Sequence, residues 1–210
     1  MQFASEGRKE SLQCGGGTNV GKLAGAIKMR ILSDNLTQIE MIGPQAMYTA
    51  IKSIILAEEY ANEDSSGKVM AVRPEMVQLK DRVAPSGRTT ETAALRLNVA
   101  TVERFKDVDH ESIYFSGDTN PGVAAGLLCR LVESKGTAPV ACMGAAATSK
   151  ALKAFMITED YLRRNSTLGD KVLAFQVQKD LFKEGGEDRT RLLFSCGLVP
   201  GTVYAPKGTK

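Results

Sequence analysis

The sequence contains no tryptophan and only one histidine among its 210 residues. His110 lies between Asp109 and Glu111 in a charged stretch, so catalytic triads and metal centres built on histidine cannot be assembled. The chain also lacks the interleaved aromatic residues that are typical of surfaces on which single-stranded nucleic acid stacks. The sequence therefore argues against an enzyme of the histidine-dependent kind, and it predicts no metal site and no cofactor.

Cysteine is scarce as well, and it follows no pattern. The four cysteines are Cys14, Cys129, Cys142 and Cys196, which form no CxxC pair and share no spacing. Neither a zinc site nor a disulfide framework is predicted, and reduced, mostly buried thiols are expected. The N-terminal stretch 1–11 is charged and polar without the apolar core of a secretory signal, which indicates an intracellular, cytoplasmic protein.

Long apolar runs and a strong net charge are also missing. The longest apolar runs, such as Ile54–Ala57 and Val123–Leu128, are far shorter than the roughly 18 residues of a membrane-spanning helix, so no membrane partner is expected. The net charge of +3 is small for a protein that binds many phosphates, and any basic surface must be a local patch. With 43% hydrophobic and 24% charged residues, the composition indicates an ordinary globular chain with a packed core.

The chain contains an internal repeat. A shift of 101 positions aligns Thr18-Asn19-x-Gly21 with Thr119-Asn120-x-Gly122, and the alignment continues without a gap for about 45 residues. Further on, after small insertions, the stretch that begins at Lys68 still pairs with the one that begins at Lys171. The sequence predicts two domains of one fold, at residues 11–103 and 112–204, joined by a short charged linker at residues 104–111.

Each copy has the pattern of a small α/β (α+β) unit. A short strand ends in a glycine-rich turn at residues 15–17, where glycine permits backbone conformations closed to other residues. The helix that follows has Asn19 as a candidate N-cap and places Leu23, Ile27 and Ile31 on one face. A strand, a second helix and two alternating strands follow, so the order β-α-β-α-β-β is predicted for both copies.

The small and apolar residues of this pattern resemble a known family. The stretches Ala24-Gly25-Ala26-Ile27 and Ile42-Gly43-x-x-Ala46-x-x-x-Ala50-Ile51-Lys52 are similar to the stage V sporulation protein S family of the Alba superfamily. The second copy resembles it through Ala125-Gly126-Leu127 and Met143-Gly144-x-x-Ala147, so the resemblance covers nearly the whole chain except its ends and linker. Members usually have a single domain, and tandem duplication is a departure from that pattern.

The resemblance implies a non-catalytic protein that binds nucleic acid, either RNA or DNA. Alba-type domains associate as dimers, so the two copies are expected to pair within the chain as a pseudo-dimer. The resemblance also implies two contact regions, the start of the first helix and the arm between the last two strands of the first copy. The predicted nucleic-acid-binding residues are Asn19, Lys22, Arg73, Lys80, Arg82 and Arg88.

The two contact regions differ between the copies. Residues 73–88 carry four basic side chains against two acidic ones, whereas residues 179–189 have at least as much acid as base. Val123 replaces Lys22 in the second copy, although a helix N-terminus favours anions in either. The contact is therefore expected from the first copy. A solvated lysine and a plain exposed loop are the alternative interpretations of these two regions.

One motif suggests nucleotide binding. Gly16-x-x-x-x-Gly21-Lys22 matches the first part of a phosphate-binding P-loop. However, Leu23 occupies the position where magnesium binding requires Ser or Thr, and a unit with so few strands is too small for an NTPase sheet. We interpret the motif as a structural turn and helix start, and the sequence predicts no enzyme.

Two acidic pairs also repeat, Glu58-Glu59 and Glu159-Asp160, each at the end of the second helix of its copy. Acids at a helix C-terminus oppose the helix dipole, so these pairs are interpreted as solvated or partner-facing ends rather than catalytic carboxylates. A partner-facing role belongs to the alternative function of the chain. In that alternative it is a structural or scaffolding subunit of a large organellar or cytoskeletal assembly, for example a ciliary microtubule-associated one, in which two Alba-like units form a rigid block.

Overall fold

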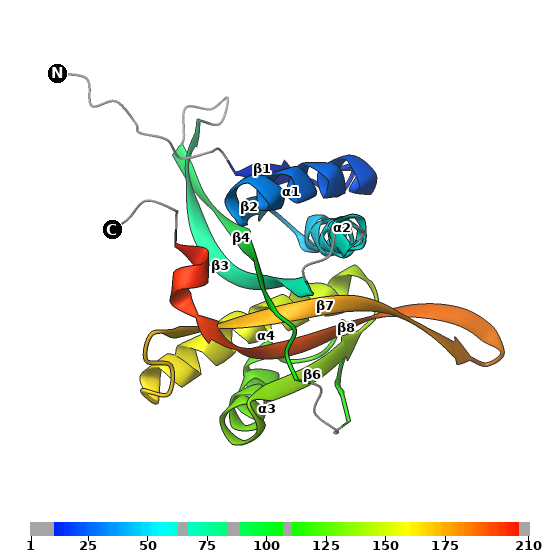
Figure 1. The fold of residues 1–210 in the computed structure, drawn as a ribbon, viewed down its shortest axis with the longest axis vertical. Helices are drawn as coiled ribbons and strands as arrows, with labels where there is room; N and C mark the ends of the chain where they lie inside the picture. Colours follow the sequence, from blue (N-terminus) through cyan, green and yellow to red (C-terminus); the bar gives the residue numbers. More distant parts are fainter. Residues whose placement is uncertain (1–10, 63–66, 84–88, 107–110, 206–210) are drawn as a thin grey trace.

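The computed structural model describes residues 11–62, 67–83, 89–106 and 111–205, and it repeats one six-element unit (Figure 1). The first unit consists of β1 (Leu12–Cys14), α1 (Val20–Asp34), β2 (Leu36–Met41), α2 (Pro44–Asn62), β3 (Lys68–Val83) and β4 (Thr89–Glu103). The second unit consists of β5 (Ile113–Phe115), α3 (Pro121–Lys135), β6 (Thr137–Cys142), α4 (Gly144–Arg164), β7 (Lys171–Glu184) and β8 (Glu187–Pro200), and the 3-10 helix η1 (Gly201–Tyr204) follows it. The mixed fold and the predicted order of elements are confirmed for both copies.

The first helix of each unit begins and ends in the same way. At the start of α1, the side-chain oxygen of Asn19 accepts a hydrogen bond from the Lys22 amide at 3.0 Å. At the start of α3, the side-chain oxygen of Asn120 accepts from two amides, and Pro121 occupies the first turn. Both helices end at a residue in the left-handed region, Asn35 with φ of 58° and Gly136 with φ of 82°. Local capping therefore fixes these helices in both copies.

The strands form one eight-stranded sheet in the order β1-β2-β4-β3-β7-β8-β6-β5. Within each unit the first two strands are parallel and the others antiparallel. The units join where β3 meets β7, at the single antiparallel pair Val72–Phe175. Because the order reads the same from both edges, the two units are related by an approximate twofold axis at this pair, as in a symmetric dimer.

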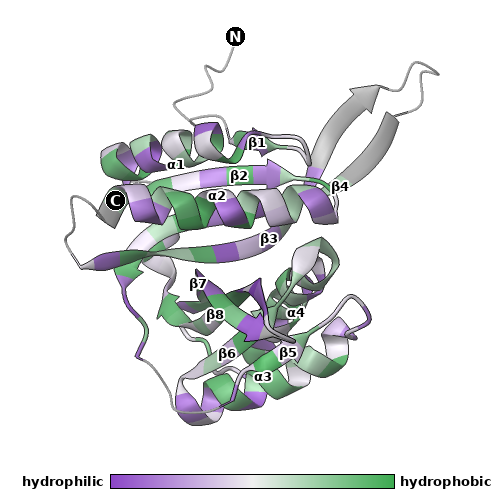
Figure 2. Ribbon diagram, turned by 90° about the vertical axis from the view of Figure 1, so that its right-hand side faces the viewer, coloured by the Kyte–Doolittle hydropathy of each residue, from purple (hydrophilic) through white to green (hydrophobic). Residues whose placement is uncertain are grey.

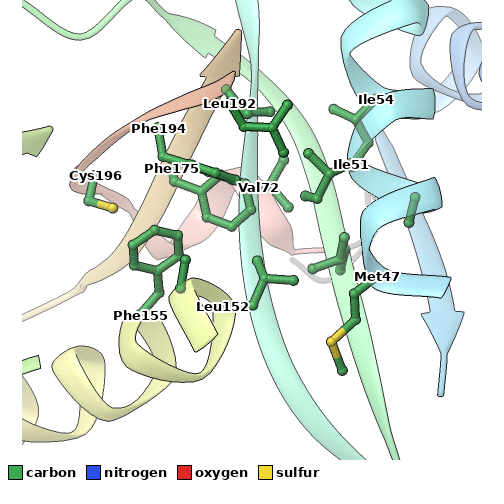
Figure 3. Close-up of a cluster of buried hydrophobic side chains, with 14 of the residues drawn as sticks. Met47, Ile51, Ile54, Val72, Leu152, Phe155, Phe175, Leu192, Phe194 and Cys196 are labelled. Atoms are coloured by element: carbon green, nitrogen blue, oxygen red, sulfur yellow. The ribbon is translucent and has the colours of Figure 1, made fainter. Parts of the chain in front are cut away.

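A single hydrophobic core spans both units on the helical side of the sheet. Met47 and Ile51 of α2 lie close to Val72 of β3 at the junction, with Leu152 of α4 and Phe175 of β7 on the other side (Figure 3). The rings of Phe155, Phe175 and Phe194 pack with centroids 5.1 to 5.6 Å apart. Such aromatic pairs contribute about 0.5–1.5 kcal/mol each beyond their burial. The two units therefore share a core rather than possessing two separate ones.

Figure 2 shows the units one above the other. Helices α2 and α4 contact each other across the junction. The opposite side of the sheet at the junction is covered by a smaller cluster, to which the connector contributes Phe105 and η1 contributes Val203 and Tyr204. Its strand residues are Ala71, Val102, Val172, Ala174 and Val199. The connector therefore packs against the sheet through Phe105 instead of only spanning the units.

The last two strands of each unit extend beyond the body as a hairpin. In the first unit, β2 pairs with β4 only as far as Leu95, whereas β3 and β4 remain paired out to Val83 and Thr89. In the second unit, β6 pairs with β8 as far as Leu192, and β7 and β8 continue to their turn. We call these extensions the first arm (residues 77–83 and 89–94) and the second arm (residues 180–184 and 187–191) (Figure 1).

Candidate functional site

The glycine-rich turn before α1 is packed against α2. The Gly15 amide donates to the Thr18 hydroxyl at 2.9 Å, and the Thr49 hydroxyl of α2 donates to the Gly16 carbonyl at 3.4 Å. A Cβ atom on Gly16 would lie 3.0 Å from the Gln45 side chain, so a larger residue at this position would require that side chain to move. The turn therefore has a structural role, in agreement with our interpretation of the P-loop-like motif.

The turn nevertheless leaves one basic side chain at the start of α1. The side-chain oxygen of Asn19 is occupied by the helix cap, whereas Lys22 is exposed. The first turn of α1 contains no acidic residue, and the Lys22 ammonium has no ion pair with any residue that the structure describes. Free amides and a positive dipole end accompany this lysine, which favours an anion at this position.

Arg73, a predicted nucleic-acid contact, binds the other unit instead. Its Nη2 lies 2.8 Å from Oε1 of Glu159 on α4, and its Nε donates to Oε2 of the same carboxylate at 3.2 Å. Arg163, one helical turn further along α4, donates to Oε1 at 2.8 Å. The hydrogen bond from Arg73 to Glu159 raises the pKa of the guanidinium, and its Nε and Nη2 groups are engaged within the protein. We therefore leave Arg73 out of the proposed interface.

The other predicted basic contacts are on the first arm. Lys80 and Arg82 belong to β3, and the structure describes the backbone alone at these positions. Arg82 pairs with Thr90 of β4 after an irregularity in the register. Arg88 lies outside the described residues, as does His110 in the linker.

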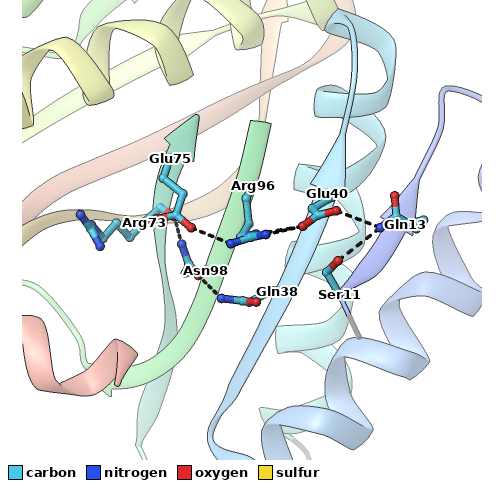
Figure 4. Close-up of polar contacts among 8 residues, drawn as sticks. All are labelled: Ser11, Gln13, Gln38, Glu40, Arg73, Glu75, Arg96 and Asn98. Atoms are coloured by element: carbon cyan, nitrogen blue, oxygen red, sulfur yellow. Dashed lines mark hydrogen bonds and ion pairs between the residues drawn. The ribbon is translucent and has the colours of Figure 1, made fainter. Parts of the chain in front are cut away.

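A polar network crosses the open side of the first unit's sheet (Figure 4). Glu40 of β2 accepts hydrogen bonds from Arg96 of β4, at 2.6 and 3.0 Å, and from the Gln13 side chain at 3.0 Å. Arg96 also reaches Glu75 of β3 at 3.3 Å. Burial disfavours the charge of Glu40, but the bonds from Gln13 and Arg96 outweigh it and lower the pKa of the carboxyl. Arg96 is thus satisfied internally and is not a free phosphate contact.

The equivalent positions of the second unit are largely apolar. The strand registers place Tyr114, Ala141, Leu193 and Gln178 where the first unit has Gln13, Glu40, Arg96 and Glu75. The two copies thus share a backbone but present different chemistry on this side of the sheet.

An aromatic cluster at the base of the second arm was not apparent from the sequence. The Arg191 guanidinium lies 4.8 Å from the centroid of the Phe182 ring and 5.8 Å from that of Tyr114. It also donates to Asp180 at 2.6 Å and to the Tyr114 hydroxyl at 3.0 Å. Because Tyr114 and Arg191 are 77 positions apart, only their cross-strand register brings them together. Since Asp180 forms an ion pair with Arg191, the cluster stabilises the second arm and does not provide an unpaired cation.

The repeated acidic pairs are not simply solvated. Glu59 and Asp160 are exposed as expected, but Glu159 is buried beneath Arg73 and Arg163. Glu58 is partly buried, and its Oε2 accepts from the Met70 amide of β3 at 2.8 Å. Burial raises the pKa of Glu58 despite this bond. The first acid of each pair therefore faces the junction between the units. The prediction that the acidic pairs are solvated is wrong for Glu58 and Glu159.

The cysteine thiols and the possible metal ligands do not form a reactive site among the described residues. All four cysteines are free and buried, as predicted, and burial raises the pKa of Cys142 to about 11, which disfavours a thiolate. Within the described ranges, no cluster of three or more His, Cys, Asp or Glu residues could hold a metal ion. No helix among the described residues is long and apolar enough to cross a membrane.

Comparison with known proteins supplies the family. No curated protein matches the chain. The model of the family described as Stage V sporulation protein S (SpoVS) matches twice, at residues 10–101 and 111–191. These segments correspond to the two structural units and together cover most of the chain. The protein therefore belongs to the stage V sporulation protein S family and carries two tandem copies of its domain.

Proposed function

We propose that this chain is a non-catalytic, intracellular nucleic-acid-binding protein that contacts phosphates through its first unit. The observation that carries the proposal is the position of Lys80 and Arg82 on the first arm, a two-stranded extension that projects beyond the body of the sheet. A projecting hairpin with basic side chains can follow a nucleic-acid backbone, because phosphate contacts provide most of the affinity of such proteins. Family membership supports the same role.

Lys22 supports a second contact within the same unit. It is exposed at the N-terminus of α1, where free amides accompany its charge. The second unit has Val123 at this position, and its arm carries at least as much acid as base. The proposed interface is therefore one-sided, unlike that of a symmetric dimer in which both arms bind.

A salt-dependent binding titration tests this function. Fluorescently labelled single-stranded and duplex RNA and DNA are titrated with the protein at two salt concentrations, and affinity is expected to fall steeply as salt rises. Replacing Lys80, Arg82 and Arg88 with alanine is expected to weaken binding at least about tenfold and to reduce the salt slope by up to about three. The matched control replaces Lys179, Lys183 and Arg189 of the second unit and should keep the affinity. The proposal fails if no nucleic acid binds at low salt, or if both triple variants behave alike.

Exposed apolar side chains favour a structural role as the second candidate. Val123 and Leu127 of α3 are 75% and 42% exposed, and Met143 before α4 is 45% exposed. Large exposed apolar side chains on neighbouring turns of a helix are typical of protein contact surfaces. For this candidate, Val123→Asp should abolish assembly with partner proteins, measured by cross-linking in the cells of origin, and leave nucleic-acid binding unchanged. Cross-links that survive this substitution would exclude α3 as the contact surface.

A further inference from the structure

The approximate twofold axis allows each site at the junction to be compared with its counterpart. The axis passes through the Val72–Phe175 pair, so the next residues along β3 and β7, Arg73 and Gln176, are equivalent. The repeat likewise makes Glu159 of α4 equivalent to Glu58 of α2. The junction therefore contains two related carboxylate sites with different occupants.

At the first site the carboxylate is fully occupied. Arg73 binds both oxygens of Glu159, and Arg163 binds Oε1 as well. Two guanidinium groups thus share one carboxylate. The planar fork of arginine suits this bidentate arrangement better than an ammonium group does.

At the second site the position of the arginine is taken by Gln176, which turns to the connector. Its Oε1 accepts from the Phe105 amide at 3.0 Å, and its Nε2 donates to the Glu103 carbonyl at 2.9 Å. Glu58 accepts only the Met70 amide through Oε2, and its Oε1 has no hydrogen bond from any residue that the structure describes. The second site therefore retains the carboxylate but has no arginine at the strand position, and the charge of Arg104 acts on Glu58 without a hydrogen bond.

A hollow occupies the space beside this carboxylate. Its volume is about 40 Å³, compared with the roughly 10–15 Å³ that a single water needs by the same kind of measure. The residues that line it and matter here are Glu58, Arg104, Phe105, Gln176, Gln178 and Ser195. The hollow is thus lined by the Glu58 carboxylate, the Arg104 guanidinium, the Gln178 amide and the Ser195 hydroxyl, while the polar atoms of Gln176 bind the connector.

We propose that this hollow binds a guanidinium group, presented as an arginine side chain by a partner protein. The guanidinium would pair with Glu58 as Arg73 pairs with Glu159, and the side-chain oxygens of Gln178 and Ser195 can accept its outward N–H groups. Arg104 also lines the hollow, but the first site shows that one carboxylate at this junction accommodates two guanidinium groups. The site involves neither the first arm nor Lys22, so it is independent of nucleic-acid binding.

Two-dimensional NMR of the full chain tests the site through the Met70 amide, which donates to Glu58. Titration with N-acetyl-arginine amide is expected to shift the Met70 signal saturably, and N-acetyl-lysine amide should bind at least about tenfold more weakly. Glu58→Gln should abolish the shift, whereas Glu59→Gln at the exposed neighbouring residue should retain it. Gln176→Arg should fill the hollow from within and block the probe, which provides a second variant if Glu58→Gln unfolds the chain.

Several results would overturn the proposal. An absent or non-saturable shift, equal binding of the lysine probe, or an unchanged shift in Glu58→Gln would each exclude a guanidinium site. Free arginine is titrated in parallel, because its ammonium and carboxylate distinguish an amino-acid ligand from a protein side chain. Tighter binding of free arginine than of the blocked form would rule out the partner protein as the source. None of these outcomes depends on whether the chain binds nucleic acid.

Discussion

At the residue scale, the ion pair with Glu159 indicates that Arg73 stabilises the fold and does not bind phosphate. Its side chains are 26% and 9% exposed, so removing Arg73 leaves a largely buried carboxylate with only Arg163 beside it. We expect Arg73→Ala to lower the free energy of unfolding by about 2 kcal/mol, less than for a fully buried pair. Arg163→Ala, which breaks a more exposed pair, should cost about 0.3–0.5 kcal/mol. Urea denaturation measures both.

The same variant tests the assignment of Arg73. Nucleic-acid affinity of the folded Arg73→Ala protein should be close to that of the wild type, because the Arg73 guanidinium is held by both oxygens of Glu159. If Arg73→Ala left stability unchanged and weakened nucleic-acid binding, Arg73 would belong to the interface that the sequence predicted. The sequence could not reveal the pair, because Arg73 and Glu159 are 86 positions apart and belong to different units.

Glu58 gives a pH-dependent prediction at the same scale. Burial raises its pKa above the ordinary 4.5, and the Met70 amide and the Arg104 charge only partly oppose the shift. A carboxyl with a raised pKa favours the fold most when protonated, and this contribution is lost as pH rises through the folded-state pKa. Glu58→Gln, whose amide oxygen can still accept from Met70, should therefore be more stable than the wild type at neutral pH. The difference in stability between Glu58→Gln and the wild type should disappear near pH 4.

Thermal unfolding at neutral and acidic pH checks this expectation. Glu59→Gln is the control, because Glu59 is exposed and should show no such trend. A stability difference that grows on acidification would mean that the fold stabilises the ionised carboxylate, contrary to the direction argued from burial.

At the scale of the element, the two copies provide an internal comparison of helix endings. α1 ends at Asn35 and α3 at Gly136, both with positive φ, and only glycine adopts this region without steric cost. Asn35→Gly should raise the free energy of unfolding by about 0.5 kcal/mol, and Gly136→Ala should lower it by about 1 kcal/mol. Urea denaturation of both variants checks the prediction. If both variants changed the free energy of unfolding equally and in the same direction, contacts with neighbouring residues, and not backbone conformation, would determine stability at these positions.

Local signals explain which elements the sequence could predict. Asn19 as a cap, the four-residue spacing of Leu23, Ile27 and Ile31, and alternation in the last strand all act within a few residues, and the structure has these features. The stack of Tyr114, Arg191 and Phe182 depends on the register of four strands, β5, β6, β8 and β7, which no local pattern encodes. The cluster could therefore not be predicted from the sequence, and it leaves the expected lack of a base-stacking surface untested, because its rings pack on Arg191.

At the scale of the whole molecule, the repeat predicted a common backbone but not the differences between the copies. The strand order is symmetric, yet Glu40 and Arg96 of the first unit correspond to Ala141 and Leu193 of the second. The resemblance implied pairing of the copies, and their contact depends on Val72 and Phe175, which side-chain pattern alone does not distinguish from other strand residues. The two copies thus share a dimer-like core but differ in the side chains on the other side of the sheet.

The shared core predicts how the chain behaves when its connector is cut. Core residues of both units form one cluster, and Val72 and Phe175 at the junction are fully buried, so separation would expose apolar surface from α2, α4, β3 and β7. A protease site engineered at residues 107–110 should therefore yield two fragments that remain together through gel filtration and native mass spectrometry. Val72→Asp, which buries an unpaired charge at the junction, should release them, whereas Val123→Asp at an exposed position should not. Two folded fragments that separate as monomers without any substitution would show that the units are independent domains, and the pseudo-dimer would then contribute little to stability.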